Sequence, residues 1–379
     1  MLPLIGDTAY LIITWRSALM FAVCLPIVII ACMLLARRVE GAANKWLAGF
    51  LVVGVLAQVP QIIGFAGFYT VWPGLTFAPF TLKLFAGPLL YLHASSLMQD
   101  TKVSRLWWSL APGVIEFGYY LWAFTCLGDY QSKWAYTEAV HLPYIWPVET
   151  ALGLGFLIIA VVAVYRLIGR YRSFLQDTQS AAADFEPLWL SRLIIAMVIA
   201  GGLFACIELA PVFLGEVSYV DEFPLQIAMT AVVAWLAFQA LLQTTVRFPK
   251  MGESTRGEGE ELAGPRGKDW VAEALTLKRA VADGNWYLES RLSIGEVASR
   301  MATNETYVSR AVNKGLGLTF NAFINQLRVG FAKELLSSSN LPLLHIAAES
   351  GFNSKATFNR VFRDLAGQTP TQYRTSQNP

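Results

Sequence analysis

Lysine, arginine and asparagine side chains recur near the C-terminus at the spacing of one helical face. Lys355, Asn359 and Arg363 are four residues apart, with Ala356 and Arg360 beside them. Side chains four residues apart lie on the same side of an α-helix, so we expect a basic, polar face here. Such groups donate hydrogen bonds to phosphate oxygens and to the edges of bases. The pattern therefore predicts a helix that could lie in the major groove of DNA.

The residues around this helix follow the pattern of a helix-turn-helix. Gly351 suits the turn before it, because glycine adopts a positive φ without steric cost. Apolar side chains on both sides of the turn have helical spacing, so they should form a core. The side chains expected to pack inward are Leu343, Ile346, Ala347, Phe358, Val361, Phe362 and Leu365.

A second helix-turn-helix pattern begins about 50 residues earlier. Asn304 is placed to cap its reading helix, since asparagine is a preferred N-cap residue. The apolar positions, which should be buried, are Ile294, Val297, Ala298, Met301, Val308, Ala311 and Val312. The polar positions, which share the opposite face, are Thr306, Ser309, Arg310 and Asn313.

A long helix is predicted between the two patterns. At 1.5 Å per residue, about 18 residues span roughly 27 Å. Two reading helices joined by one stiff helix could enter successive major grooves, about 34 Å apart. The apolar stripe of the joining helix consists of Phe320, Phe323, Ile324, Leu327, Phe331 and Leu335.

Residues 291–375 resemble the DNA-binding domain of the AraC/XylS transcription regulators. The matching positions are Arg328, Ala332, Leu335, Leu336, Ile346, Ala347, Gly351, Phe352, Ser354, Phe358, Phe362, Gly367, Pro370, Tyr373 and Arg374. By this resemblance, base contacts would come from Thr306, Ser309 and Arg310 in the first reader and from Lys355, Ala356, Thr357 and Arg360 in the second. The sequence departs from the family at Ala302, where the first turn usually has glycine. A non-glycine residue in the left-handed region costs about 1–2 kcal/mol, which puts the geometry of that turn in doubt.

The rest of the chain has a different composition. Residues 1–248 hold 13 basic and 14 acidic residues, whereas the shorter segment 269–379 holds 12 basic and 9 acidic residues. Apolar segments long enough to cross about 30 Å of hydrocarbon as helices fill the first part. They are roughly residues 11–36, 46–69, 76–98, 107–128, 145–168, 190–214 and 223–246. We therefore predict an all-α protein, with a seven-helix transmembrane bundle over 1–248, a flexible linker over 249–268 and a tandem helix-turn-helix domain over 269–379.

Basic residues are concentrated in alternate loops between these segments. The opposite loops offer mainly Lys133. Because cytoplasmic loops carry an excess of lysine and arginine, the N-terminus is predicted outside the cell's inner membrane and the C-terminal domain in the cytoplasm. An odd number of spans agrees with that orientation.

Four ionisable residues fall inside the predicted spans: Lys83, Glu116, Glu149 and Glu208. Such groups are costly in hydrocarbon and almost always face the interior of a bundle or a water-filled cavity. One interpretation is a ligand-sensing cavity open to the outside, and the other is a set of ion pairs that only stabilise the packing. The sequence leaves both open.

The combination predicts a membrane-bound, sequence-specific transcription regulator. Its expected partners are promoter DNA and the lipid bilayer, with RNA polymerase, a second copy of the chain and an unknown small-molecule or membrane signal as further candidates. Two alternatives remain: a transporter or other membrane protein with an appended autoregulatory DNA-binding domain, or a tether between DNA and membrane. No catalytic constellation, ATP-binding glycine box or zinc-ligand spacing occurs, so no enzyme activity, metal or cofactor is predicted. Because the linker is flexible, altered subunit pairing is the expected output of the signal.

Overall fold

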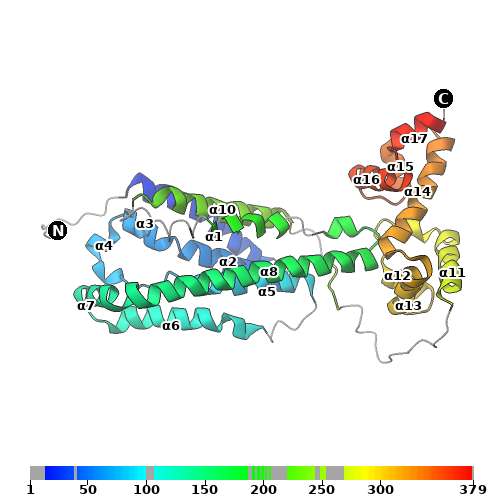
Figure 1. Ribbon diagram of the computed structural model, residues 1–379. Helices are drawn as coiled ribbons and strands as arrows, with labels where there is room; N and C mark the ends of the chain where they lie inside the picture. The colour runs from blue at the N-terminus through cyan, green and yellow to red at the C-terminus, as the bar shows by residue number, and fades with distance from the viewer. Residues whose placement is uncertain are drawn as a thin grey trace. The chain divides into compact units, whose positions relative to one another are not determined.

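The computed structural model describes residues 13–37, 41–99, 106–186, 190–192, 194–196, 198–199, 201–202, 205, 220–243, 248–252 and 269–377. These residues form helices and connecting turns, without a named β-strand, which confirms the all-α class (Figure 1). The chain divides into two compact units. The N-terminal unit comprises residues 1–168 with 187–248, and the C-terminal unit comprises 169–186 with 249–379.

The N-terminal unit is built from apolar helices. Four of the described helices are long and apolar enough to cross a membrane: Trp15–Ala36, Gly41–Phe65, Tyr130–Thr178 and Phe223–Leu242. The segments predicted at 76–98 and 107–128 form two shorter helices of 16 residues each, Lys83–Met98 and Ala111–Cys126. The segment predicted at 190–214 lies largely outside the described residues. Seven spans therefore stay a prediction.

The elements of this unit follow one another with short connections. They are α1 (Trp15–Ala36), α2 (Gly41–Leu56), α3 (Val59–Phe65), α4 (Phe68–Val71), α5 (Lys83–Met98), α6 (Ala111–Cys126), α7 (Tyr130–Tyr136), a π-helical stretch (Thr137–Ile145), α8 (Trp146–Thr178) and α10 (Phe223–Gln243). Short 3-10 turns occur at Pro73–Leu75 and Trp107–Leu110. Helix α8 continues past the end of the N-terminal unit, and its residues from 169 onward belong to the C-terminal unit.

Small residues let the helices of the N-terminal unit approach closely. α1 packs against α2 and α10, and α2 packs against α5. On α5, a Cβ atom added at Gly87 would lie 2.5 Å from the carbonyl oxygen of Phe156 on α8. A Cβ added at Gly153 on α8 would lie 3.3 Å from Cβ of Lys83. Glycines at helix contacts are the usual route to close packing in membranes, and here they bring the start of α5 against the start of α8.

The C-terminal unit consists of short helices around one long helix. Its elements are the end of α8, a 3-10 turn (Ala182–Phe185), α11 (Trp270–Asp283), a 3-10 turn (Trp286–Leu288), α12 (Ile294–Arg300), α13 (Glu305–Arg310), a π-helical stretch (Ala311–Leu316), α14 (Phe320–Ser338), α15 (Leu343–Glu349), α16 (Lys355–Ala366) and α17 (Pro370–Gln377). Residues 249–252 of the predicted linker are described, and residues 253–268 lie outside the described residues.

Two hydrophobic cores share α14. Its first half contributes Phe320, Phe323 and Ile324 to a core with α11, α12 and α13. Its second half contributes Val329, Ala332 and Leu336 to a core with α15, α16 and α17. Each core buries the apolar face of one helix-turn-helix, so α14 is the shared support of both, as its apolar stripe predicts. The prediction that Leu365 packs inward is wrong, because 43% of its surface is exposed.

Candidate nucleic-acid interface

The first helix-turn-helix is held at both of its helix starts by side-chain caps. The Ser293 hydroxyl accepts from the backbone N–H of Glu296, whose carboxylate accepts in return from the Ser293 backbone N–H. Asn304 accepts from the N–H of Tyr307 at 2.8 Å, as predicted for the N-cap of α13. These caps satisfy N–H groups that have no partner within their own helix and so define where the reading helix begins.

The turn between α12 and α13 keeps a glycine-like conformation without a glycine. Ala302 has a φ of 51°, in the left-handed region. The sequence put the geometry of this turn in doubt, and the turn is made with the alanine nonetheless. Its backbone is stabilised by the Thr303 N–H, which donates to the Ala298 carbonyl at 2.9 Å.

The first reader presents the predicted polar side chains away from the core. Thr306, Arg310 and Asn313 are exposed, and Ser309 is half-buried. The Asn313 amide donates to the Ser309 hydroxyl at 3.2 Å, so these two groups lie on one face although α13 gives way to a π-helical stretch at Ala311. On the opposite face, Val308, Ala311 and Val312 are buried, as predicted.

The second reader repeats this arrangement with a true glycine turn. Gly351 has a φ of 79°, and the Ser354 hydroxyl caps α16 by accepting from the N–H of Thr357 at 3.1 Å. Among the predicted contact residues, Lys355, Ala356, Arg360 and Arg363 are exposed, while Thr357 and Asn359 are half-buried. Phe358 and Phe362 lie fully in the core beneath them. The predicted DNA-contacting residues thus form a polar surface that can donate to phosphates and bases.

Arg328 on α14 is a buried cation at the centre of this unit. Its exposed fraction is 1%, and its guanidinium donates to the carbonyl oxygens of Tyr287 at 2.7 Å and Glu289 at 2.6 Å. It also donates to the Ser180 hydroxyl at 3.1 Å. Burial lowers the pKa of Arg328 to about 10, opposed by the nearby carboxylate of Asp184, so the group stays charged at neutral pH. The sequence matched Arg328 to the family but gave no sign of its contact with residues near 180.

Known proteins share this region with the chain. Residues 297–376 match a family described as a helix-turn-helix domain. The C-terminal unit contains an AraC-type DNA-binding domain. An uncharacterised HTH-type transcriptional regulator from Staphylococcus aureus is 35% identical over 83 residues, which are 22% of this chain and 11% of that protein. Regulatory protein PocR from Salmonella typhimurium is 33% identical over 102 residues, 27% of this chain and 34% of PocR.

The AraC-type domain accounts for the whole of these similarities. The chain spans about a tenth of the length of the staphylococcal relatives and about a third of PocR. A solved structure, the C-terminal domain of AraT, a response regulator from Geobacillus stearothermophilus, is 28% identical, covers 29% of this chain and 88% of that chain, and gives a TM-score of 0.26. The shared region therefore identifies a DNA-binding transcription regulator of AraC type, and leaves the role of the N-terminal unit to be argued from its own residues.

A cluster of ionisable residues in the N-terminal unit is the second candidate site. Lys83 lies 3.5 Å from the Glu149 carboxylate and donates to the Thr150 hydroxyl at 3.3 Å. Tyr120 donates to the other Glu149 oxygen at 2.8 Å. Glu116 accepts from the backbone N–H groups of Lys83 and Leu84, each at 2.9 Å, and so caps α5 from a neighbouring helix.

Three of the four predicted ionisable residues therefore converge, from α5, α6 and α8. The fourth, Glu208, lies outside the described residues. Tyr120 and Thr150 were not predicted, although Tyr120 stands one helical turn after Glu116 and Thr150 directly follows Glu149. No group of three or more potential metal-ligating side chains occurs in the part of the chain that the structure describes.

Proposed function

We propose that this protein is a membrane-bound, sequence-specific transcription regulator whose apolar N-terminal unit senses a signal and whose AraC-type domain reads a promoter. The observation that carries the proposal is the pair of exposed polar readers supported by one helix, α14, in the same chain as four helices of membrane-spanning length. A DNA reader attached to a bilayer acts only on DNA brought to the membrane, which suits control by a signal received there.

In the proposed complex, the two readers enter successive major grooves. Arg310 and Arg360 are the strongest candidates for base contacts, because arginine can pair with guanine through two parallel hydrogen bonds. Thr306, Ser309, Lys355, Ala356 and Thr357 would complete the base-facing set, as the family resemblance implies. The remaining polar residues, Asn313, Asn359 and Arg363, are suited to phosphate contacts that hold the register of the protein on the duplex.

For the sensing role, we propose the cluster of Lys83, Glu116 and Glu149, extended by Glu208. The hydrogen bonds of Lys83, Tyr120 and Glu149 join three helices, so a change at one helix is felt by the other two. A signal can act only if it favours one arrangement of these helices over another. A second copy of the chain and RNA polymerase are further proposed partners, and the orientation with the C-terminal unit in the cytoplasm is part of the proposal.

The test uses the full chain reconstituted in lipid nanodiscs. A pool of random DNA duplexes is passed over the particles, and the retained sequences are determined after several rounds. We expect enrichment of a bipartite motif whose halves are about one helical turn apart, 10–10.5 base pairs. Retention of every sequence equally would contradict specific reading and favour a DNA–membrane tether. A genome-wide footprint in cells, compared with neighbouring genes, then identifies the promoter.

A further inference from the structure

Residues 179–186, the segment that follows α8, are seated on the DNA-binding domain. We call this segment the clasp. Its start pairs with the loop before α12, where Gln179 forms an antiparallel bridge with Ser293 and the Ser180 N–H donates to the Leu292 carbonyl at 3.0 Å. The Asn321 amide on α14 donates to the Ser180 carbonyl at 2.7 Å. The clasp therefore contacts both the first helix-turn-helix and the helix that supports the two readers.

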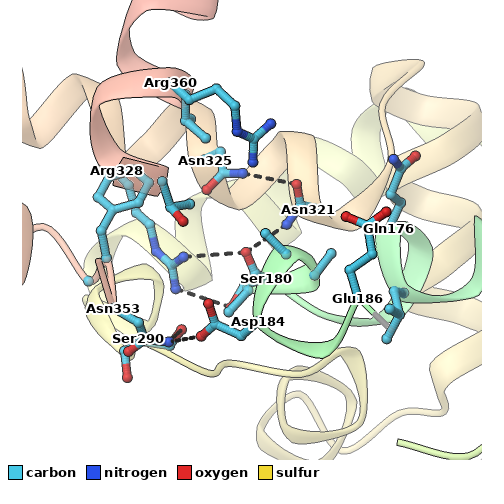
Figure 2. Close-up of a pocket in the computed structure, with 18 of the residues that line it drawn as sticks. Gln176, Ser180, Asp184, Glu186, Ser290, Asn321, Asn325, Arg328, Asn353 and Arg360 are labelled. Atoms are coloured by element: carbon cyan, nitrogen blue, oxygen red, sulfur yellow. Dashed lines mark hydrogen bonds between the residues drawn. The ribbon is translucent and has the colours of Figure 1, made fainter. Parts of the chain in front are cut away.

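The end of the clasp lies beside the second reader. The Asn353 amide donates to the Asp184 carboxylate at 2.5 Å, and Asn353 directly precedes Ser354, the N-cap of α16. Figure 2 shows Asp184 and Glu186 from the clasp, with Arg328 and Arg360 from the DNA-binding domain, around one pocket. Thr357 lines the same pocket. Two residues assigned to base contacts, Thr357 and Arg360, thus share a pocket with two acidic residues of the clasp.

The charge of the clasp is the opposite of what a DNA-binding surface needs. The start of a helix favours an anion, because its N–H groups and dipole point outward, and DNA-reading helices commonly use this end for phosphates. Here the Asp184 carboxylate lies next to the start of α16. The second acid, Glu186, is held by Arg172 of α8 at 2.6 Å. A phosphate approaching the same flank of α16 would meet these carboxylates at short range.

We propose that the clasp is an intramolecular competitor of DNA: its acidic end occupies the flank of the second reader, and DNA binding displaces it. The inference rests on the proposed DNA-reading function. It also supplies a route for the signal other than subunit pairing, since the clasp directly follows α8, the helix that carries Glu149 and Thr150 near its start. The flexible linker is then no longer the one connection between sensing and reading.

The DNA-binding domain can release the clasp without losing its own structure. Arg328 keeps the carbonyls of Tyr287 and Glu289 when Ser180 leaves, so the buried cation retains two hydrogen-bond acceptors. Both hydrophobic cores consist of residues between 270 and 373. Among the clasp residues, Phe185 is a buried aromatic side chain, with the guanidinium of Arg291 5.8 Å from its ring centre. Release would expose this one ring and hydrate the carboxylates.

Hydrogen exchange on the full chain in nanodiscs tests the displacement directly. The probe is a duplex recovered by the wild-type protein from a random pool. We expect residues 179–186 to exchange faster when the duplex is bound, because the Ser180 N–H loses its acceptor at Leu292, while α16 exchanges more slowly. Unchanged or slower exchange over 179–186 in a complex that protects α16 would overturn the proposal.

Affinity measurements with matched variants give a second test. Asp184→Asn should tighten DNA binding by the full chain roughly 3- to 10-fold, the order of one weakened charged contact. Asp177→Asn removes the same charge from α8, outside the pocket, and should change the affinity less than 2-fold. Equal effects of the two variants would mean that only net charge matters, and no effect of Asp184→Asn would mean that the clasp does not compete. Absence of specific binding by the wild-type chain would instead contradict the proposed function itself.

Discussion

Ala302 and Gly351 occupy corresponding turns of the two helix-turn-helix units and share a left-handed backbone, with φ angles of 51° and 79°. The two turns differ in their surroundings. A Cβ atom added at Gly351 would lie 2.7 Å from the Leu288 carbonyl oxygen and 3.0 Å from Nε of Arg328. Ala302 is exposed, so its Cβ atom has space. The first turn therefore tolerates a side chain at a conformational cost, whereas the second has no room for one.

Replacing Ala302 with glycine should stabilise the DNA-binding domain. The left-handed conformation costs a non-glycine residue about 1–2 kcal/mol, and part of this is offset by the greater freedom of glycine in the unfolded chain. We expect a net increase of about 0.5–1 kcal/mol in the free energy of unfolding. Urea unfolding of a fragment 269–377, followed by circular dichroism, measures it. Gly351→Ala is the opposing control, and a loss of stability in Ala302→Gly would show that the turn is not strained.

Truncating either candidate base-reading arginine should weaken specific DNA binding. Arg310→Ala and Arg360→Ala should each cost about 1–3 kcal/mol if the guanidinium pairs with a base. Gel-shift titration of fragment 269–377 on the selected duplex and on a scrambled duplex is the measurement. Arg279→Ala on α11, which removes the same charge from an exposed position away from both readers, is the matched control. A loss equal in all three variants would reduce the arginines to general electrostatic attraction.

The proposed orientation predicts opposite locations for two loops. Fusions of a phosphatase that is active only outside the cytoplasm should be active after Lys133, and fusions of a fluorescent protein that folds only in the cytoplasm should fluoresce after Arg172. The reason is the concentration of lysine and arginine in alternate loops. Both positions reporting one side of the membrane would mean that the span count is wrong. Protein levels checked by immunoblot separate a silent fusion from a degraded one.

Local signals in the sequence predicted much of the DNA-binding domain. The cap at Asn304, the turn at Gly351 and the shared support by α14 each follow from a few neighbouring residues, and the structure confirms them. Leu365 has the spacing of an inward residue but lies one turn from the end of α16, where the core no longer covers it. Periodicity indicates which face is apolar and does not indicate where the partner surface stops.

Contacts between distant segments were beyond prediction. Glu116 and Lys83 are 33 residues apart, and their helices could have faced many partners. The clasp has no amphipathic repeat, and Ser180 contacts Arg328 across 148 residues of chain. Its polar side chains are typical of a cytoplasmic loop between two spans. Single side-chain to backbone hydrogen bonds create this interface, and these leave no periodic signal in the sequence.

The ion pair of Lys83 and Glu149 should be coupled energetically, whatever signal it serves. The Glu149 side chain is 6% exposed and the Lys83 side chain 23%, so removal of one charge leaves the other poorly solvated. Lys83→Met and Glu149→Gln should each lower the unfolding free energy of the full chain in detergent by about 1–3 kcal/mol. The double variant should lose less than the sum of the two, because neither charge is then left without its partner. Thermal unfolding midpoints of the four proteins measure this coupling. In cells, a promoter reporter driven by the selected duplex tests sensing: each single variant should change reporter output at normal protein abundance, while DNA binding by fragment 269–377 is unaffected because it lacks both residues. Normal output with clear thermal coupling would assign the pair to packing alone.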